Sequence, residues 1–276
     1  MRRIDANGTS IACKVSGTGP AVVLIHGAEA DHSMFDAFGA WLAGHFTVVA
    51  YDQRDSGGTR NPSVPYGLAE LADDAAALIA ALGYGRAHVF GTSLGGVIAQ
   101  ALAARHPGRI GRLVLSSTFR AGMAPSSINP DVFARLAALR AGLPGTAAEI
   151  AGYFFPAAHI AAHPEVIDIF SGTRRTTEQR QRRAGILAQA LADDLQAISA
   201  STLLLVGAED RLIPPAHTLS LAREIAEART SMLPGVGHVG TVQAPDVVAR
   251  EVIAFLKAED GGFDHDHSGE GLLPAS

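Results

Sequence analysis

Gly91-Thr92-Ser93-Leu94-Gly95-Gly96 is the stretch of this sequence that decides the fold. A short apolar run at residues 88–90 precedes it and predicts a strand, and the alanine-rich residues 97–104 predict a helix. A serine between two glycines at such a junction matches the G-x-S-x-G pattern of a nucleophile elbow. The turn must be tight and its serine strained, and the flanking glycines let strand and helix approach closely. Taken alone, the motif also fits a glycine-rich turn with an incidental serine, so the rest of the chain has to decide.

Buried strands and helices are predicted on both sides of this motif. Continuous apolar runs at residues 21–25, 46–51, 113–115 and 202–206 are typical of strands covered on both faces, and residues 230–233 predict a last strand. Helical patterns at residues 33–43, 68–82, 215–226 and 244–257 alternate with these strands. An N-terminal hairpin over residues 2–16 turns at Asn7-Gly8. The alternation predicts an α/β fold with a mostly parallel central sheet and helices on both faces.

The pattern changes between residues 118 and 189, where buried strand runs disappear and prolines separate short helical stretches. We therefore expect an inserted helical cap at 118–189 on a core formed by residues 1–117 and 190–257. Residues 258–276 are rich in Gly, Asp and His and are expected to form a disordered tail. Asp264-His265-Asp266-His267 in this tail could chelate a metal, but a solvated segment is favoured because no ordered surroundings are evident.

Composition restricts the class of protein further. The chain has 276 residues, is 47% hydrophobic and carries a net charge of −5, which argues against disorder and against a nucleic-acid partner. Its single cysteine, Cys13, excludes an internal disulfide, and no grouping has metal-ligand spacing, so no metal or cofactor is expected. Neither a signal-peptide pattern nor a membrane-spanning apolar run is visible, which predicts a cytoplasmic protein with no membrane partner. Its state as monomer or homodimer stays open.

Three polar residues follow the ends of separate predicted strands. Ser93, Asp210 and His238 each come directly after an apolar run, in the order Ser, acid, His. Ligands and catalytic groups collect at the carboxyl ends of the strands in open α/β sheets. This order is also that of the catalytic triad of α/β-hydrolases.

The chain resembles the α/β-hydrolase superfamily over about residues 2 to 257. The motifs that carry the resemblance are His26-Gly27, Asp52-Gln53-Arg54-Asp55-Ser56-Gly57, Gly91-Thr92-Ser93-Leu94-Gly95, Gly207-Ala208-Glu209-Asp210 and Gly237-His238. Asp55 departs from the commoner D-x-R-G-x-G form, in which a glycine stands at this position. With an aspartate at this position, the segment resembles the form of the motif in some methylesterases of the aclacinomycin type.

The resemblance implies a role for each site residue. Ser93 would attack an acyl carbon, His238 would take its proton, and Asp210 would orient the imidazole. Backbone N–H groups of Ala28 and Leu94 would form the oxyanion hole. Glu209 is the alternative acid, and Asp210 is favoured because it directly precedes the Arg-Leu-Ile-Pro turn.

Other polar residues of these motifs have structural roles under the same interpretation. His26 is expected to brace the oxyanion loop, and Asp52 and Asp55 to shape their loop by accepting backbone N–H hydrogen bonds. The remaining histidines are interpreted as surface or structural residues.

The leading hypothesis is a cofactor-free serine hydrolase that cleaves a carboxylic ester or lactone through an acyl-enzyme on Ser93. A hydrolase of C–C bonds in diketone-type ring-fission products and a non-catalytic ligand receptor on the same fold are the alternatives. The residues expected to line a small-molecule pocket under the cap are Met34, Phe119, Phe133, Tyr153, Phe154 and Val239. A basic run in the cap consists of Arg174, Arg175, Arg180, Arg182 and Arg183. We interpret this run as a solvated helix face, with a substrate carboxylate as its alternative partner.

Overall fold

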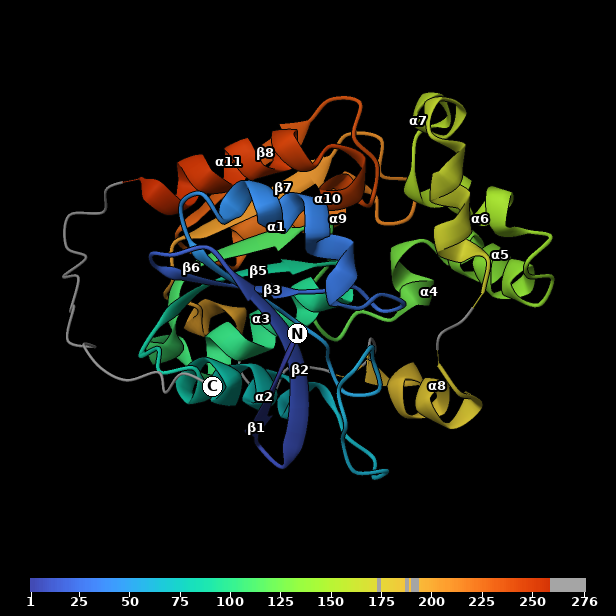
Figure 1. The fold of residues 1–276 in the computed structure, drawn as a ribbon. Coiled ribbons are helices and arrows are strands. Elements are labelled where there is room, and N and C mark those ends of the chain that lie inside the picture. The colour runs from blue at the N-terminus through green and yellow to red at the C-terminus, as the bar shows by residue number, and fades with distance from the viewer. Residues whose placement is uncertain (173–174, 187–188, 190–193, 259–276) are drawn as a thin grey trace.

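The computed structural model describes residues 1–172, 175–186, 189 and 194–258 (Figure 1). Its centre is an eight-stranded sheet with the strand order β1-β2-β4-β3-β5-β6-β7-β8. The strands are β1 (Arg2–Ala6), β2 (Thr9–Ser16), β3 (Ala21–Ile25), β4 (Thr47–Tyr51), β5 (Ala87–Thr92), β6 (Ile110–Ser116), β7 (Thr202–Gly207) and β8 (Ala228–Leu233). β2 pairs antiparallel with β1 and β4, and the other neighbouring strands pair in parallel. The predicted fold class is confirmed.

Helices cover both faces of this sheet (Figure 1). The α-helices are α1 (Asp36–Leu42), α2 (Leu68–Ala81), α3 (Leu94–Arg105), α4 (Pro125–Ile128), α5 (Pro130–Arg140), α6 (Ala147–Phe154), α7 (Ala157–Ala162), α8 (Thr177–Ala184), α9 (Pro215–Ser220), α10 (Gly240–Gln243) and α11 (Pro245–Lys257). The 3-10 turns are η1 (His32–Phe35), η2 (Pro107–Arg109), η3 (Pro164–Phe170), η5 (Leu195–Ala197) and η6 (Leu221–Arg223). α1 and α11 lie on one face, and α2 and α3 lie on the other.

Each side of the sheet has its own hydrophobic core. Along β3, Val23 and Ile25 pack with α2 and α3, whereas Val22 and Leu24 pack with α1 and α11. Successive side chains of a strand point to opposite faces, so a strand covered on both sides must be apolar at every position. This requirement explains why the central strands are continuous apolar runs rather than alternating ones. β8 lies at the edge of the sheet and is partly exposed.

The N-terminal hairpin forms as predicted, and one predicted helix is shorter than expected. Asn7 and Gly8 have φ angles of 49° and 69°, as a tight two-residue turn between antiparallel strands requires. The helix expected at 215–226 is shorter than predicted, because α9 ends at Ser220 and continues as the 3-10 turn η6.

Helices α4 to α8 fill the segment between β6 and β7, where the sequence predicts a cap. α4, α5, α6 and α7 form one group, and α8 stands apart from them beside the loop that follows β4 (Figure 1). The cap boundaries at 118 and 189 stay a prediction. The predicted tail beyond residue 258, with its Asp264–His267 stretch, lies outside the described residues, as does Arg174.

Candidate active site

Ser93 occupies the turn between β5 and α3, where the motif placed it. Its backbone has φ 54° and ψ −123°, a conformation that costs a non-glycine residue about 1–3 kcal/mol. Surrounding hydrogen bonds hold it there. The Ser93 carbonyl accepts from the N–H of Gly96 at 2.9 Å and from Thr118 Oγ1 at 2.7 Å, and the Ser93 N–H donates to Ser116 O at 3.0 Å. The side chain is partly exposed, in a buried neighbourhood.

The glycines around Ser93 are required by close backbone approach. A Cβ on Gly95 would overlap the carbonyl oxygen of Ile25, and a Cβ on Gly91 would overlap that of Gly95. These neighbours are backbone atoms and cannot rotate away. The elbow therefore depends on glycine at both positions, as the motif predicts.

Substituting Gly95 with alanine is expected to lower the free energy of unfolding by about 2–3 kcal/mol, since β3 and α3 must separate to admit a methyl group. Gly108→Ala is the matched control, because a Cβ there meets nothing within 4 Å. Urea denaturation of both variants measures the difference. Equal stability of the two variants would show that the elbow is not close-packed.

Asp210 and His238 form a buried pair at the ends of β7 and β8. His238 Nδ1 lies 2.8 Å from Asp210 Oδ2, and the two side chains are 4% and 1% exposed. Asp210 Oδ1 accepts from the N–H groups of Leu212 and Ile213 at 3.0 and 2.9 Å. An acceptor opposite Nδ1 favours the tautomer that carries its proton there, which leaves Nε2 free to accept. Glu209 is exposed, so the carboxylate paired with His238 is that of Asp210.

The loop that carries His238 is held from two sides. The His238 N–H donates to Phe154 O at 2.9 Å, and the two rings meet edge to face at 5.5 Å. Gln243 bridges the same loop, accepting from Gly237 N and donating to Gly235 O, both at 2.7 Å. Gln243 is not predicted from the sequence, because a glutamine in a helix has no pattern that identifies such a bridge.

The loop after β3 approaches Ser93 from the other side. A Cβ built on Gly27 would lie 3.6 Å from the Cβ of Ser93, so residues 26–28 run directly beside the elbow. The N–H of Leu94 lies in the first turn of α3, where backbone N–H groups have no intrahelical partner. Ala28 is partly exposed. The two backbone segments with the proposed oxyanion donors therefore meet at this elbow.

His26 has a structural position, fully buried within this loop. Its Nδ1 lies 2.7 Å from Gly27 O, and its Nε2 accepts from the N–H of Gln53 at 3.2 Å. Burial, together with the nearby charge of Arg183, lowers the pKa of His26 to about 3. The ring is therefore neutral at ordinary pH and braces the loop.

Asp52 and Asp55 have different partners, although the sequence predicts backbone N–H partners for both. Asp52 accepts from the N–H groups of His32 at 2.8 Å and Gly58 at 2.7 Å, as predicted. For Asp55 the expectation of backbone N–H partners is wrong. Its carboxylate accepts two hydrogen bonds from Arg182, both at 2.8 Å, and one from Tyr66 at 3.0 Å.

The backbone conformation of Asp55 is one that a glycine adopts easily. Its φ is 55°, in the left-handed region that favours glycine. A glycine is the commoner residue at this position of the motif. Here an aspartate has the left-handed conformation instead, and its carboxylate pairs with Arg182.

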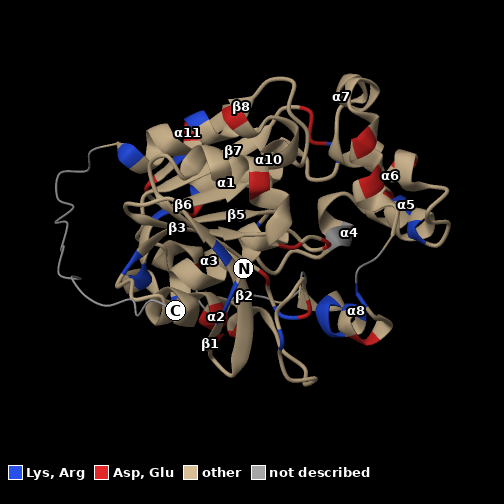
Figure 2. Cartoon of the chain, in the orientation of Figure 1, with Lys and Arg blue, Asp and Glu red and all other residues tan. Residues whose placement is uncertain are grey.

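The interpretation of the cap arginines as a solvated face is wrong for most of those described. Arg175 and Arg183 are buried, and Arg182 is largely so. Figure 2 shows the basic residues of α8 beside the loop that follows β4. Their partners lie more than a hundred residues earlier in the chain, which a local charge pattern cannot show. Arg180 is exposed, as expected.

Most of the predicted pocket residues are partly exposed. Met34, Phe133, Tyr153, Phe154 and Val239 belong to this group. Phe119 is 1% exposed and packs in the core, so we leave it out of the proposed pocket. Phe154 contacts Phe170 with ring centroids 4.7 Å apart, which gives the surroundings of His238 an aromatic wall.

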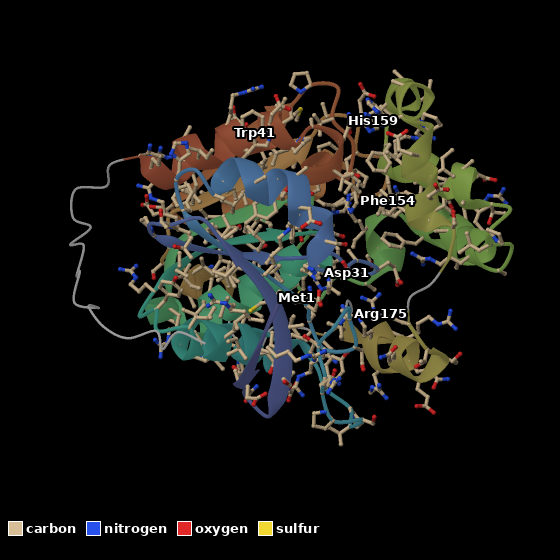
Figure 3. All side chains as sticks on the ribbon, in the orientation of Figure 1. Met1, Asp31, Trp41, Phe154, His159 and Arg175 are labelled. Carbon is tan, nitrogen blue, oxygen red and sulfur yellow. The ribbon has the colours of Figure 1, made fainter. Side chains whose placement is uncertain are left out.

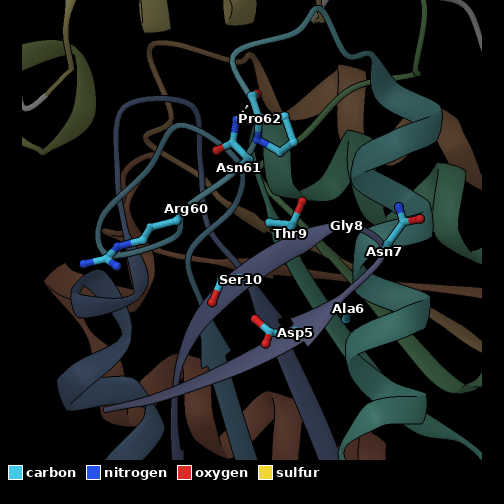
Figure 4. A pocket seen from close by; sticks show the side chains of 9 residues that line it. All are labelled: Asp5, Ala6, Asn7, Gly8, Thr9, Ser10, Arg60, Asn61 and Pro62. Carbon is cyan, nitrogen blue, oxygen red and sulfur yellow. Dashed lines mark hydrogen bonds between the residues drawn. The ribbon is translucent and has the colours of Figure 1, made fainter.

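Two other features of the described residues lie outside this site. Asp31, His32 and Asp52 bring potential metal-ligand atoms within 4.8 Å of one another, but backbone N–H groups of the two loops after β3 and β4 already donate to the carboxylates. A surface hollow at the N-terminal hairpin is lined by residues 5–10 and 60–62 (Figure 4) and includes none of the candidate site residues. In the part of the chain that is described, no helix is both long and apolar enough to cross a bilayer.

The comparisons with known proteins agree with this architecture. The family model described as "alpha/beta hydrolase fold" matches residues 20–245. A protein named "Putative carbamate hydrolase RutD" from Variovorax paradoxus is 32% identical over 248 residues, which cover 86% of this chain and 92% of that protein. An esterase from Thermogutta terrifontis superposes with a TM-score of 0.79 at 26% identity, covering 93% of this chain and 98% of the other. The enol-lactonase from Burkholderia xenovorans gives 0.76 at 29% identity, covering 91% and 98%. The chain therefore belongs to the alpha/beta hydrolase fold family.

Proposed function

We propose that the protein is a serine hydrolase that cleaves a carboxylic ester or lactone through an acyl-enzyme on Ser93. The observation that carries the proposal is the buried contact of 2.8 Å between Asp210 and His238, on the same sheet edge as a strained serine. Backbone strain often occurs at functional sites, and strain at a serine on the same sheet edge as a buried Asp–His pair supports a chemical role for that serine.

In the proposed reaction, Ser93 Oγ attacks the acyl carbon while His238 Nε2 takes the hydroxyl proton. Asp210 keeps the imidazole in the tautomer with its proton on Nδ1 and stabilises the imidazolium that forms. The N–H groups of Ala28 and Leu94 donate to the oxyanion of the tetrahedral intermediate.

The intermediate collapses when the bond from the acyl carbon to the leaving oxygen breaks, and His238 returns the proton to that oxygen. Water then attacks the acyl-enzyme with the same base, which releases the acid and restores Ser93. The aromatic ring of Phe154 beside His238, with Phe170 packed against it, favours an apolar group on the substrate.

A carbamate is the second candidate substrate, favoured by the name of the relative from Variovorax paradoxus. A carbamate carries nitrogen instead of carbon on the acyl carbon, and the same attack and collapse apply to it. The preference for an ester or a carbamate depends on the protein groups that contact the atom bonded to the acyl carbon, which is carbon in an ester and nitrogen in a carbamate.

A fluorophosphonate probe and a substrate panel test the proposal together. The intact protein is expected to become labelled at Ser93, as mapped by peptide mass spectrometry, and to hydrolyse at least one class among p-nitrophenyl esters, lactones and aryl carbamates. The class with the highest kcat/KM decides between the two candidates. A folded protein that is not labelled at Ser93 and hydrolyses none of the panel would contradict the proposal and favour a ligand receptor.

A further inference from the structure

Arg175 connects the segment before α8 to the loop that contains the proposed oxyanion donor Ala28. The Arg175 side chain is 6% exposed. Nη2 donates to Ala30 O at 3.0 Å, and Nη1 lies 3.3 Å from Glu29 Oε2. Figure 3 shows Arg175 next to the loop of Asp31, between the main body of the molecule and α8.

The same guanidinium also holds a second loop. Nε donates to Asp55 O at 2.7 Å, and Nη2 donates to Ser56 Oγ at 2.6 Å. One planar group therefore fixes the residues after Ala28 against the loop that follows β4. A planar fork with several donors can fix two loops at once, which the point charge of a lysine cannot do.

Arg183 supports the beginning of the oxyanion loop, at His26, through one intermediate residue, Gln53. Its Nη2 donates to Gln53 Oε1 at 2.8 Å, and its Nη1 donates to Arg54 O at 2.6 Å. Gln53 Nε2 in turn donates to His26 O at 2.6 Å. Residues 26–30 are thus held at both ends by arginines of one short cap segment.

We propose that Arg175 is a positioning residue that sets the oxyanion loop, with Arg183 and Gln53 supporting its other end. This inference rests on the proposed function, because it needs Ala28 to act as an oxyanion donor. The geometry of the oxyanion hole then depends on the contacts that Arg175 and Gln53 make with residues 26–30. Misplacement of a catalytic group by about 1 Å can lower a rate by about a hundredfold, so a loop held by this fork is sensitive to its loss.

Arg182 offers a matched control within the same helix. Its guanidinium makes its two hydrogen bonds of 2.8 Å to the carboxylate of Asp55, which lies outside the oxyanion loop. Arg182→Gln therefore removes the ion pair with Asp55 and leaves the contacts of Arg175 and Gln53 to residues 26–30 in place.

The experiment compares Arg175→Gln, Arg175→Lys and Arg182→Gln in the full-length protein, with the best substrate of the panel. Arg175→Gln is expected to lower kcat about 30- to 100-fold with KM within about threefold of the parent. The kcat of Arg175→Lys is expected to lie between those of Arg175→Gln and the parent. The kcat of Arg182→Gln is expected to stay within about threefold of the parent. If Arg175→Gln does not fold, the lysine variant provides the same comparison.

A boronic acid that adds to a serine and mimics the tetrahedral intermediate provides the second readout. Its inhibition constant should rise in the Arg175 variants by the factor by which kcat/KM falls, because both depend on the oxyanion hole. A purely structural role would lower the melting temperature without this parallel.

Two results would overturn the inference alone. They are unchanged kcat and boronic acid affinity in both Arg175 variants, or equal losses in Arg175→Gln and Arg182→Gln. A parent protein that neither hydrolyses the panel nor binds the boronic acid would overturn the proposed function, and this inference with it.

Discussion

Replacing Ser93 with alanine is expected to lower kcat/KM by about 10⁴-fold or more for whichever substrate class the protein hydrolyses. Without the hydroxyl no acyl-enzyme can form, and the residual rate reflects only binding and the oxyanion hole. Initial rates measured over a range of substrate concentrations give the ratio. Alanine keeps the Cβ and therefore the backbone strain of residue 93, so the melting temperature should stay close to that of the parent.

Ser117 provides a matched control for this measurement. It follows β6, also has a positive φ of 45°, and its N–H donates to Leu205 O at 2.9 Å. Ser117→Ala is expected to keep kcat/KM within about threefold of the parent. Comparable activity in Ser93→Ala would remove Ser93 as the nucleophile, whichever substrate is used.

Asp210→Asn is expected to lower kcat by about 10³- to 10⁴-fold with a small effect on KM. An asparagine can present its NH₂ group to Nδ1 of His238, which favours the tautomer with the proton on Nε2. That nitrogen then cannot accept the proton of Ser93. Burial of the pair makes the effect large, because water cannot replace the missing carboxylate.

The control for this prediction is Glu209→Gln, the neighbouring and exposed carboxylate. It is expected to stay within about twofold of the parent in kcat. The combined variant Ser93→Ala with Asp210→Asn should be no slower than Ser93→Ala alone, since the two residues act as one unit. If losses from the two substitutions multiply, the pair does not serve Ser93.

Much of the fold follows from the sequence because burial acts locally on each strand. A strand covered on both faces has to be apolar throughout, so residues 21–25 and 202–206 can be identified without any knowledge of their neighbours. The elbow is local in part, since Gly91 is needed by the turn itself, whereas Gly95 is needed because α3 passes close to the carbonyl of Ile25 in β3. The placement of Ser93, Asp210 and His238 at one edge of the sheet then follows from the parallel strands, whose carboxyl ends lie at that edge.

The residues that support the site could not be found in this way. Arg175 and Arg183 stand in a charged run whose partners are distant in sequence, and such a run normally faces solvent. Thr118 and Gln243 are ordinary polar residues whose hydrogen bonds become visible only in three dimensions. Specific long-range hydrogen bonds leave no periodic signal in a sequence.

The aspartate at position 55 has a consequence for how this family varies among species. Because φ there is 55°, glycine is the residue of least strain, and the hydrogen bonds of the aspartate carboxylate, two of them from Arg182 and one from Tyr66, offset that strain. Homologues with glycine at the first position have no acid for an arginine to pair with at the second. The two positions should therefore covary through evolution, with Asp–Arg and Gly–non-Arg as the frequent combinations. If α8 were exchanged between relatives, the ion pair of Arg182 would be kept only if the residue at position 55 were exchanged with it.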